Sequence, residues 1–239
     1  MPPTGSQPRR TVAIGDIHGC SGALAALTYR LAPKPSDTFV ILGDVVDRGP
    51  DSRGAIELLL ELRQRCEVVC LLGNHEQMLL EAVDGVFPTH EWLIHGGAET
   101  LDSYALGAAP RGIDPRHVDF IRTWQDYWEG DSHFFVHGGY AAEHSFAEQP
   151  WHDLRWQSLK YLLPGPHASG KTAVVGHTAN KWGNIVNLGH LVCIDTYCYG
   201  GGWLTALDVG AGEVWQTRSD GMIRRGALPP PTEHFQPDA

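Results

Sequence analysis

Residues 43–49, with the sequence Gly-Asp-Val-Val-Asp-Arg-Gly, place two carboxylates and a guanidinium within five residues. They follow an apolar run at 39–42, which we expect to be a buried strand. Asp44 and Asp47 can bind divalent metal ions, and Arg48 can hold a phosphate through two parallel hydrogen bonds. A buried structural role rarely needs this combination, so the segment indicates a site for metal and phosphate.

Four other expected strand ends also carry side chains that can bind metal. The runs at 11–14, 68–72, 134–136 and 173–175 are short and apolar, with β-branched or aromatic residues. The polar residues that follow these runs are Asp16 and His18, Asn74 and His75, His137, and His177. Helical patterns separate the first three strands, which predicts parallel pairing with right-handed crossovers. Because the carboxyl ends of parallel strands meet at one edge, the motifs should converge there.

Carboxylates combined with neutral imidazoles suit Mn, Fe or Zn better than Ca²⁺ or an all-oxygen Mg²⁺ site. The set is large enough for two divalent or trivalent ions if one carboxylate bridges them. Such ions, ~3.5–4 Å apart, would activate a bound water near neutral pH and neutralise a phosphate under in-line attack. His75 is a candidate general acid for the leaving alkoxide, and Asp47 is a candidate to orient it.

Each motif alone has an ordinary structural explanation. A glycine followed by Asp or His after a strand is usually a turn, and Asp47 with Arg48 could be a solvated ion pair. The joint occurrence at five strand ends favours the metal centre.

The motifs at 15–19, 43–49, 73–76, 137–139 and 176–177 resemble the phosphoprotein phosphatase family of calcineurin-like metallophosphoesterases, over about 11–217. The resemblance implies an α/β (α+β) fold in which two mixed β-sheets pack as a sandwich flanked by helices. It implies that the first metal is held by Asp16, His18 and Asp44, and the second by the bridging Asp44 with Asn74, His137 and His177. Arg48 would bind phosphate, with Asn74 as a further candidate to contact it, and His75 with Asp47 would form the acid pair.

Two positions depart from the family pattern or are ambiguous. The family usually has a second phosphate-binding arginine soon after a tryptophan, but no arginine follows Trp156 at that spacing. Arg155 is the candidate substitute and Lys160 a weaker one, although a surface charge on a helix explains Arg155 equally well. Tyr197 with Cys198 resembles a pair that overhangs the metal site in eukaryotic members. Tyr197 is therefore a candidate to reach substrate, and a packing role is an equal alternative.

The chain has 239 residues, 42% of them hydrophobic, which favours one domain over two. We expect a flexible N-terminal arm at 1–10 and a metallophosphatase domain at 11–225. Within the domain, 85–130 should form a helical cap-like segment. Strand-like pieces between 185 and 216, separated by glycines, are typical of an antiparallel meander. A Pro-rich flexible tail should occupy 226–239.

The formal net charge of −10 argues against a nucleic-acid partner. The five cysteines include no Cys-x-x-Cys pair, and no apolar run approaches the ~18 residues of a membrane span. We therefore expect a cytoplasmic protein without a membrane partner. The oligomeric state is open.

The leading hypothesis is hydrolysis of a phosphomonoester on phosphorylated Ser or Thr side chains of proteins, with Mn as a suitable metal in assays. Phosphotyrosine and a small phosphoester stay open as substrates, since the sequence shows no specificity pocket. The alternative is a symmetric diadenosine tetraphosphatase, because compact bacterial members of the family include both kinds of enzyme. The aromatic residues of 87–128 could stack adenine, whereas the modest basic content offers little for a four-phosphate chain. A non-catalytic phosphate-binding module would be expected to lose a ligand or the acid, and none is lost.

Overall fold

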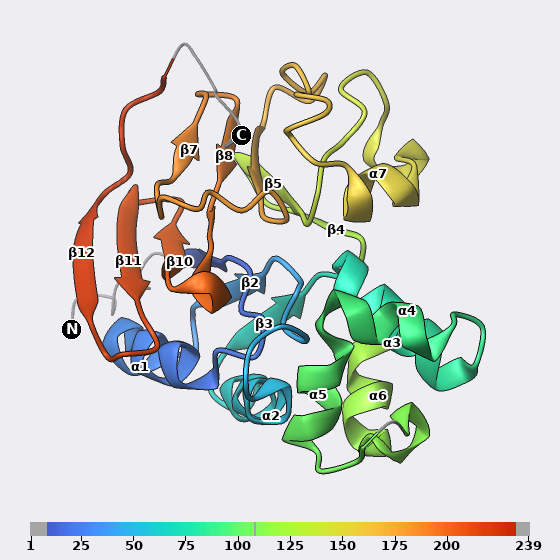
Figure 1. The fold of residues 1–239 in the computed structure, drawn as a ribbon. Helices are drawn as coiled ribbons and strands as arrows, with labels where there is room; N and C mark the ends of the chain where they lie inside the picture. The colour runs from blue at the N-terminus through green and yellow to red at the C-terminus, as the bar shows by residue number, and fades with distance from the viewer. Residues whose placement is uncertain (1–8, 108, 233–239) are drawn as a thin grey trace, which may run out of the picture.

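The computed structural model describes residues 9–107 and 109–232, which form two mixed β-sheets and flanking helices (Figure 1). The seven-stranded sheet has the order β12-β11-β10-β1-β2-β3, and β9 pairs with β10. Its strands are β1 (Thr11–Ile14), β2 (Thr38–Ile41), β3 (Glu67–Cys70), β9 (Asp195–Thr196), β10 (Trp203–Asp208), β11 (Glu213–Thr217) and β12 (Ile223–Ala227). The first three strands are parallel, as the helical crossovers predicted, and β10 joins β1 in the antiparallel sense.

The five-stranded sheet has the order β4-β5-β6-β8-β7. Its strands are β4 (Tyr127–Glu129), β5 (His133–Val136), β6 (Thr172–Val175), β7 (Val186–Asn187) and β8 (Leu191–Cys193). The central strands β5, β6 and β8 are parallel, whereas β4 and β7 are antiparallel additions at the two edges.

The period-two alternation of the strands explains the layers. In β1, Val12 and Ile14 face the helices, whereas Ala13 faces the other sheet. The core between the sheets joins residues such as Val40 of β2 to Phe135 of β5. A third core lies between the outer face of the smaller sheet and the segments that cover it, including α7. The sandwich of two mixed sheets flanked by helices is thereby confirmed.

The helices are α1 (Ser21–Leu31), α2 (Ser52–Leu62), α3 (Asn74–Asp84), α4 (Thr89–Trp92), α5 (Ala98–Ser103), α6 (Pro115–Ile121) and α7 (Trp151–Trp156). A π-helical turn, η1 (Leu93–Gly97), joins α4 to α5, and the 3-10 turns are η2 (Pro110–Gly112), η3 (Phe146–Glu148) and η4 (Cys198–Gly200). Figure 1 shows α3, α4, α5 and α6 gathered together beside β3. The segment 85–130 thus contains α4, η1, α5, η2 and α6, and it ends in the strand β4.

Several boundaries differ from the sequence-based expectations. The strand-like pieces after residue 185 do not form one meander, because the chain crosses between the sheets at Ile194, leaving β8 in one and β9 in the other. The expected tail at 226–239 is wrong at its start: β12 runs to Ala227, and the backbone of Thr232 donates to the carbonyl of Asn187. Of the expected arm at 1–10, Arg10 pairs with Asp37 at 2.6 Å. Residues 1–8 and 233–239 lie outside the described residues.

Candidate metal centre

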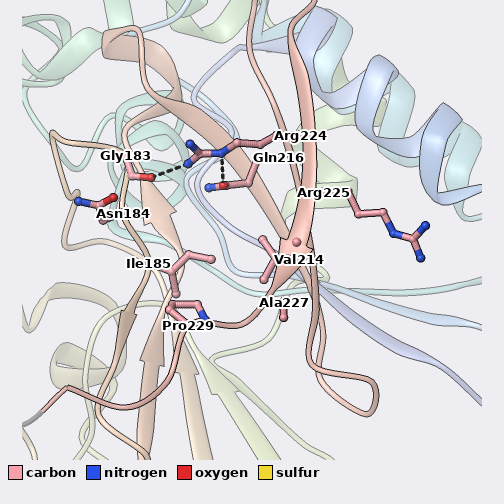
Figure 2. A pocket seen from close by; sticks show the side chains of 10 residues that line it. Gly183, Asn184, Ile185, Val214, Gln216, Arg224, Arg225, Ala227 and Pro229 are labelled. Carbon is pink, nitrogen blue, oxygen red and sulfur yellow. Dashed lines mark hydrogen bonds between the residues drawn. The ribbon is translucent and has the colours of Figure 1, made fainter.

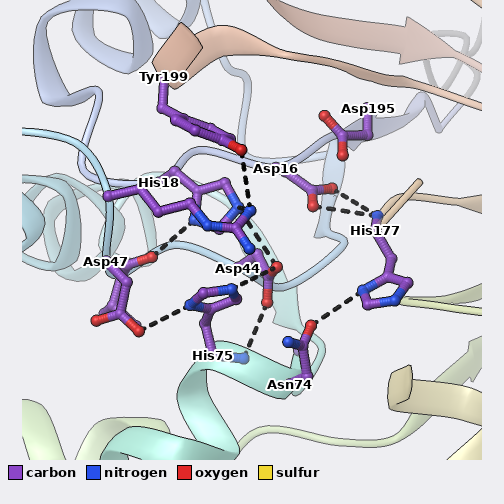
Figure 3. A network of polar contacts seen from close by, with 12 residues as sticks. Asp16, His18, Asp44, Asp47, Asn74, His75, His177, Asp195 and Tyr199 are labelled. Atoms are coloured by element: carbon purple, nitrogen blue, oxygen red, sulfur yellow. Dashed lines mark hydrogen bonds and ion pairs between the residues drawn. The ribbon is translucent and has the colours of Figure 1, made fainter. Parts of the chain in front are cut away.

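The loops that follow β1, β2 and β3 of one sheet and β5 and β6 of the other meet at one place. There the carboxyl ends of the parallel strands of both sheets lie together. Asp16 and His18 follow β1, Asp44 follows β2, and Asn74 opens α3 after β3. His137 follows β5 and His177 follows β6 in the second sheet. Figure 3 shows the side chains of Asp16, His18, Asp44, Asn74 and His177 directed toward a common centre.

Asp44 lies between two groups of possible metal ligands. Its Oδ2 is 3.4 Å from Nε2 of His18, and its Oδ1 is 3.3 Å from Nε2 of His137. One group with all ligand atoms within 4.8 Å comprises His18, Asp44 and His75, and the other comprises Asp44, His137 and His177. One carboxylate oxygen faces each group, which is the arrangement that a bridging ligand requires.

Backbone carbonyls fix two of the imidazole rings. Nδ1 of His18 lies 2.9 Å from the carbonyl of Val46, and Nδ1 of His137 lies 2.7 Å from that of Leu42. Because a carbonyl can only accept, each Nδ1 carries the proton. In the neutral ring, Nε2 then keeps a lone pair directed into the centre.

Asn74 Oδ1 completes the second group. It lies 3.1 Å from Nε2 of His137 and 3.0 Å from Nδ1 of His177, and these two nitrogens are 3.2 Å apart. Asp16 is buried, and both of its carboxylate oxygens accept from the backbone N–H of His177 at 3.1 Å. Imidazole lone pairs and carboxylate oxygens that converge so closely suit a cation of the Mn, Fe or Zn type, so the donor set fits the two expected ions.

The carboxylates of the centre are electrostatically coupled. Burial raises the pKa of Asp16 well above its usual range, and the nearby Asp195 raises it further. Burial also acts to raise the pKa of Asp44, but His137, His75 and His18 together hold it well below its usual range. Asp44 therefore keeps its negative charge in the position between the two groups.

The site residues lie in a strained backbone. Positive φ angles occur at His18 (44°), Asp44 (47°), Asp47 (70°), Arg48 (69°) and His177 (61°). Residues other than glycine rarely adopt a positive φ. Those that do cluster at functional sites, where the surrounding structure holds the backbone in place.

Glu76 holds the turn after β2 in place, a role that the sequence-based reasoning did not assign. Its Oε2 accepts from the backbone N–H groups of Asp44 at 2.8 Å and Gly73 at 3.0 Å. Its Oε1 accepts from those of Val45 at 2.7 Å and Val46 at 3.2 Å. The available signal was its place at the third position of a helix, where Glu often reaches back to backbone N–H groups.

His75 and Asp47 form the expected pair, with Nδ1 of His75 2.8 Å from Oδ2 of Asp47. Burial lowers the pKa of His75 to about 3 and raises that of Asp47 to about 8. Nε2 of His75 is buried and has no hydrogen-bond partner among the described residues. It lies 3.9 Å from Oδ2 of Asp44, so it faces the centre.

Arg48 contacts Tyr199 as well as the expected cluster. Its Nη1 donates to Nε2 of His18 at 3.0 Å and to the hydroxyl of Tyr199 at 3.4 Å, and its guanidinium carbon lies 5.0 Å from the centre of that ring. Tyr199 also packs edge-on against His18. Tyr197 is in turn packed against Tyr199, which fits the packing role that was its alternative, and its reach to substrate stays a prediction.

Arg155 is engaged away from the ligand cluster. It donates to Asp126 at 2.6 Å and to Gln77 at 3.3 Å, and it lies over the ring of Trp151. Gln77 belongs to the first turn of α3, so Arg155 lies near the centre without pointing at its ligands. Lys160 lies in the loop that follows α7.

Two other features lie apart from this centre. Glu57, Asp114 and His117 form a further group with ligand atoms within 4.8 Å, but Arg116 already pairs with both carboxylates. A cavity of about 200 Å³ lies between β12 and the loop at 183–185 (Figure 2). Its Arg224 is held by Gln216 and by the carbonyl of Gly183, and none of the predicted site residues lines it.

The chain belongs to the calcineurin-like phosphoesterase family, whose model matches residues 9–193. One relative is the symmetrical bis(5'-nucleosyl)-tetraphosphatase of Janthinobacterium sp. (strain Marseille), 32% identical over 139 residues. That alignment covers 58% of this chain and 46% of the relative. Another is serine/threonine-protein phosphatase 1 of Salmonella typhimurium, 40% identical over 90 residues, which are 37% of this chain and 39% of that protein. The matched region thus spans less than half the length of either relative.

Solved structures of low sequence identity share the fold. A crystal structure described as a candidate diadenosine tetraphosphatase has a TM-score of 0.64 at 22% identity, covering 95% of this chain and 96% of that chain. The cold-active protein-tyrosine phosphatase of a psychrophilic Shewanella has a TM-score of 0.60 at 19% identity, covering 94% and 82%. Within the part of the chain that the structure describes, no helix combines the length and the apolar character needed to cross a membrane.

Proposed function

We propose that this chain is a metal-dependent phosphoester hydrolase with a two-metal centre. Asp16, His18 and Asp44 would hold one ion, and Asp44, Asn74, His137 and His177 would hold the other. The observation that carries the proposal is the placement of one Asp44 oxygen toward each ligand group, at 3.4 Å and 3.3 Å from the two imidazoles. When bound, the ions would supply Lewis acidity, which activates water and neutralises phosphate charge.

The residues around the ions have separate roles in this proposal. Arg48 would bind the phosphate through its guanidinium, which already lies beside His18 at the edge of the cluster. His75 would give a proton to the leaving oxygen from Nε2, the atom that faces the centre without a partner. Asp47 would orient the ring through Nδ1 and stabilise its charged form.

For the substrate, we infer a dinucleoside tetraphosphate that is cleaved symmetrically: one water adds across the central anhydride and two nucleoside diphosphates leave. The support is the similarity over more than half of this chain to a symmetrical bis(5'-nucleosyl)-tetraphosphatase. This substrate therefore takes the leading place that the sequence alone gave to phosphorylated proteins.

A phosphorylated protein is the second candidate. The support is the 40% identity over 90 residues to serine/threonine-protein phosphatase 1. Arg155 is engaged with Asp126, so Arg48 is the one predicted phosphate-binding arginine beside the ligand cluster. A single arginine fits a terminal phosphate better than a chain of four.

A side-by-side assay tests the proposal. The purified Mn²⁺-loaded protein would be given diadenosine tetraphosphate, a phosphoserine peptide, a phosphotyrosine peptide and 4-nitrophenyl phosphate. We expect ADP as the sole nucleotide product, a slower release of phosphate from the other substrates, and loss of all activities after chelation. AMP together with ATP, or faster hydrolysis of the phosphoserine peptide, would contradict the leading substrate. Activity that survives complete metal removal would contradict the centre itself.

A further inference from the structure

We propose that Trp92 and Thr100, from the helical segment beside the centre, are positioning residues for the His75–Asp47 pair. This inference rests on the proposed function, because it assigns these residues to proton delivery in the same reaction. Among the described residues, the side-chain hydrogen bonds of Trp92 and Thr100 go to Asp47 and Ser52, so each acts on the centre through Asp47.

The Asp47 carboxylate is held at both oxygens. Nε1 of Trp92 donates to Oδ2 at 2.9 Å, the same oxygen that lies 2.8 Å from Nδ1 of His75. The hydroxyl of Thr100 donates to Oδ1 at 2.7 Å. All four side chains are fully buried. The two donors, together with the contact to Nδ1 of His75, therefore fix the plane of the Asp47 carboxyl group, and with it the direction of the His75 ring.

Thr100 also holds the backbone of Asp47. The N–H of Asp47 donates to the hydroxyl oxygen of Thr100 at 2.9 Å and to that of Ser52 at 3.0 Å. The two hydroxyls are 2.9 Å apart. Since the Thr100 proton is committed to the carboxylate, Ser52 donates to Thr100. This network ties the strained turn at 47–48 to α2 and α5.

The π-helical turn between the two positioning residues supports the same turn. The carbonyl of Gly96 accepts from the backbone N–H of Arg48 at 3.0 Å. Gly96 itself has a φ of 106°, and a Cβ added there would come within 2.5 Å of the Arg48 backbone nitrogen. A Cβ at Gly97 would come within 2.4 Å of the Trp92 ring. The segment 92–100 therefore packs directly on the turn whose two residues have φ angles near 70°.

Loss of either donor should impair proton delivery more than phosphate binding. A misoriented carboxylate leaves the His75 ring less well directed and less able to carry positive charge. The cost should grow as the leaving group becomes more basic, because such a group depends more on the proton. Phenyl phosphate should therefore suffer more than 4-nitrophenyl phosphate.

The experiment compares Trp92→Phe and Thr100→Val on these two substrates with the full metal-loaded chain. Trp124→Phe is the matched control, since Trp124 is also buried and its Nε1 has no hydrogen-bond partner among the described residues. Thr217→Val is the control for a buried hydroxyl, which at that position donates to the carbonyl of Ala23. Thr100→Ser keeps the hydroxyl.

We expect Trp92→Phe and Thr100→Val to lower kcat for phenyl phosphate on the order of ten-fold, part of the ~10²–10⁴-fold that a general acid contributes. The loss for 4-nitrophenyl phosphate should be smaller and KM nearly unchanged. Thr100→Ser should recover the rate, and both controls should affect the two substrates equally.

Equal losses for the two substrates in Trp92→Phe and Thr100→Val, with wild-type metal content, would overturn the inference. If Trp92→Phe does not fold, the comparison of Thr100→Val with Thr100→Ser decides the question alone. A wild-type protein that hydrolyses neither aryl phosphate overturns this inference, and one that also fails to hydrolyse diadenosine tetraphosphate overturns the proposed function.

Discussion

Replacing Glu76 by Gln removes a buried carboxylate that holds the turn at 44–46, which carries the proposed ligand Asp44. Glu76 accepts four backbone hydrogen bonds, two at each oxygen, from Gly73 and from residues 44–46. A glutamine has one carbonyl oxygen, so two of the N–H groups would face an amide nitrogen that cannot accept. We expect a less stable protein that also binds metal less well.

The size of the effect follows from two opposing contributions. Two hydrogen bonds to a charged acceptor are worth about 3–6 kcal/mol together. Burial raises the pKa of Glu76 to about 7 from 4.5, so the charge itself costs about 3 kcal/mol, and the neutral amide regains that part. The net loss is about 0–3 kcal/mol, which at ~2–4 °C per kcal/mol for a chain of this size lowers Tm by at most about 12 °C.

Thermal unfolding of the metal-free protein, monitored by circular dichroism, measures the change in Tm separately from any change in metal binding. Elemental analysis and the 4-nitrophenyl phosphate rate then report on the centre. Glu129→Gln is the control, because its ion pair with Lys171 is partly exposed and such pairs contribute ~0–1 kcal/mol. A Glu76→Gln protein with wild-type Tm, metal content and rate would refute the idea that this carboxylate supports the turn.

Three further substitutions test the assignments around the centre. Asp44→Asn should reduce the metal content from about two ions to at most one per chain by elemental analysis, because it weakens the ligand shared by both groups; two retained ions would contradict bridging. His75→Asn should keep the metal and lower the rate with phenyl phosphate by ~10²–10⁴-fold in steady-state assays; a near-wild-type rate would rule out the acid. Tyr199→Phe should raise KM for phosphate esters several-fold, because it frees the Arg48 guanidinium from its hydroxyl partner. Tyr197→Phe should leave KM unchanged. Equal KM values for the two variants would contradict the assignment of Tyr199, rather than Tyr197, as the residue that holds Arg48.

The strands and the ligand-bearing loops were predictable because their signals are local. Short β-branched runs that end in glycine and polar residues occur in order along the chain, and helices between the first three dictate parallel pairing. The convergence of the loops follows from that pairing alone. The edge strands β4 and β12 were missed since Trp128 and Arg225 lie in segments without the alternation of a half-buried strand.

The side chains that complete the centre were harder to predict, because they are defined by contacts across the fold. Tyr197 and Tyr199 are two residues apart in one loop, and it is the ring of Tyr199 that lies against Arg48. Asp195 is buried near Asp16, and burial raises its pKa to about 6, but it lies in a short strand without a motif. Sequence spacing cannot show either proximity.

The sequence reveals the proposed metal ligands better than the residues that hold the turn in place, and this difference has a physical basis. A metal ligand needs a particular side chain at the end of a particular strand, so it leaves a short motif. A residue that stabilises a strained turn needs only a hydrogen-bond donor or acceptor in the right place. Such a group can come from any element packed nearby. At 47–48, Trp92 and Thr100 donate to the Asp47 carboxylate, and the backbone carbonyl of Gly96 accepts from the N–H of Arg48; all three lie some fifty residues away in sequence. Substitutions in the helical segment should therefore alter catalysis at the centre even though none of the proposed metal ligands comes from it.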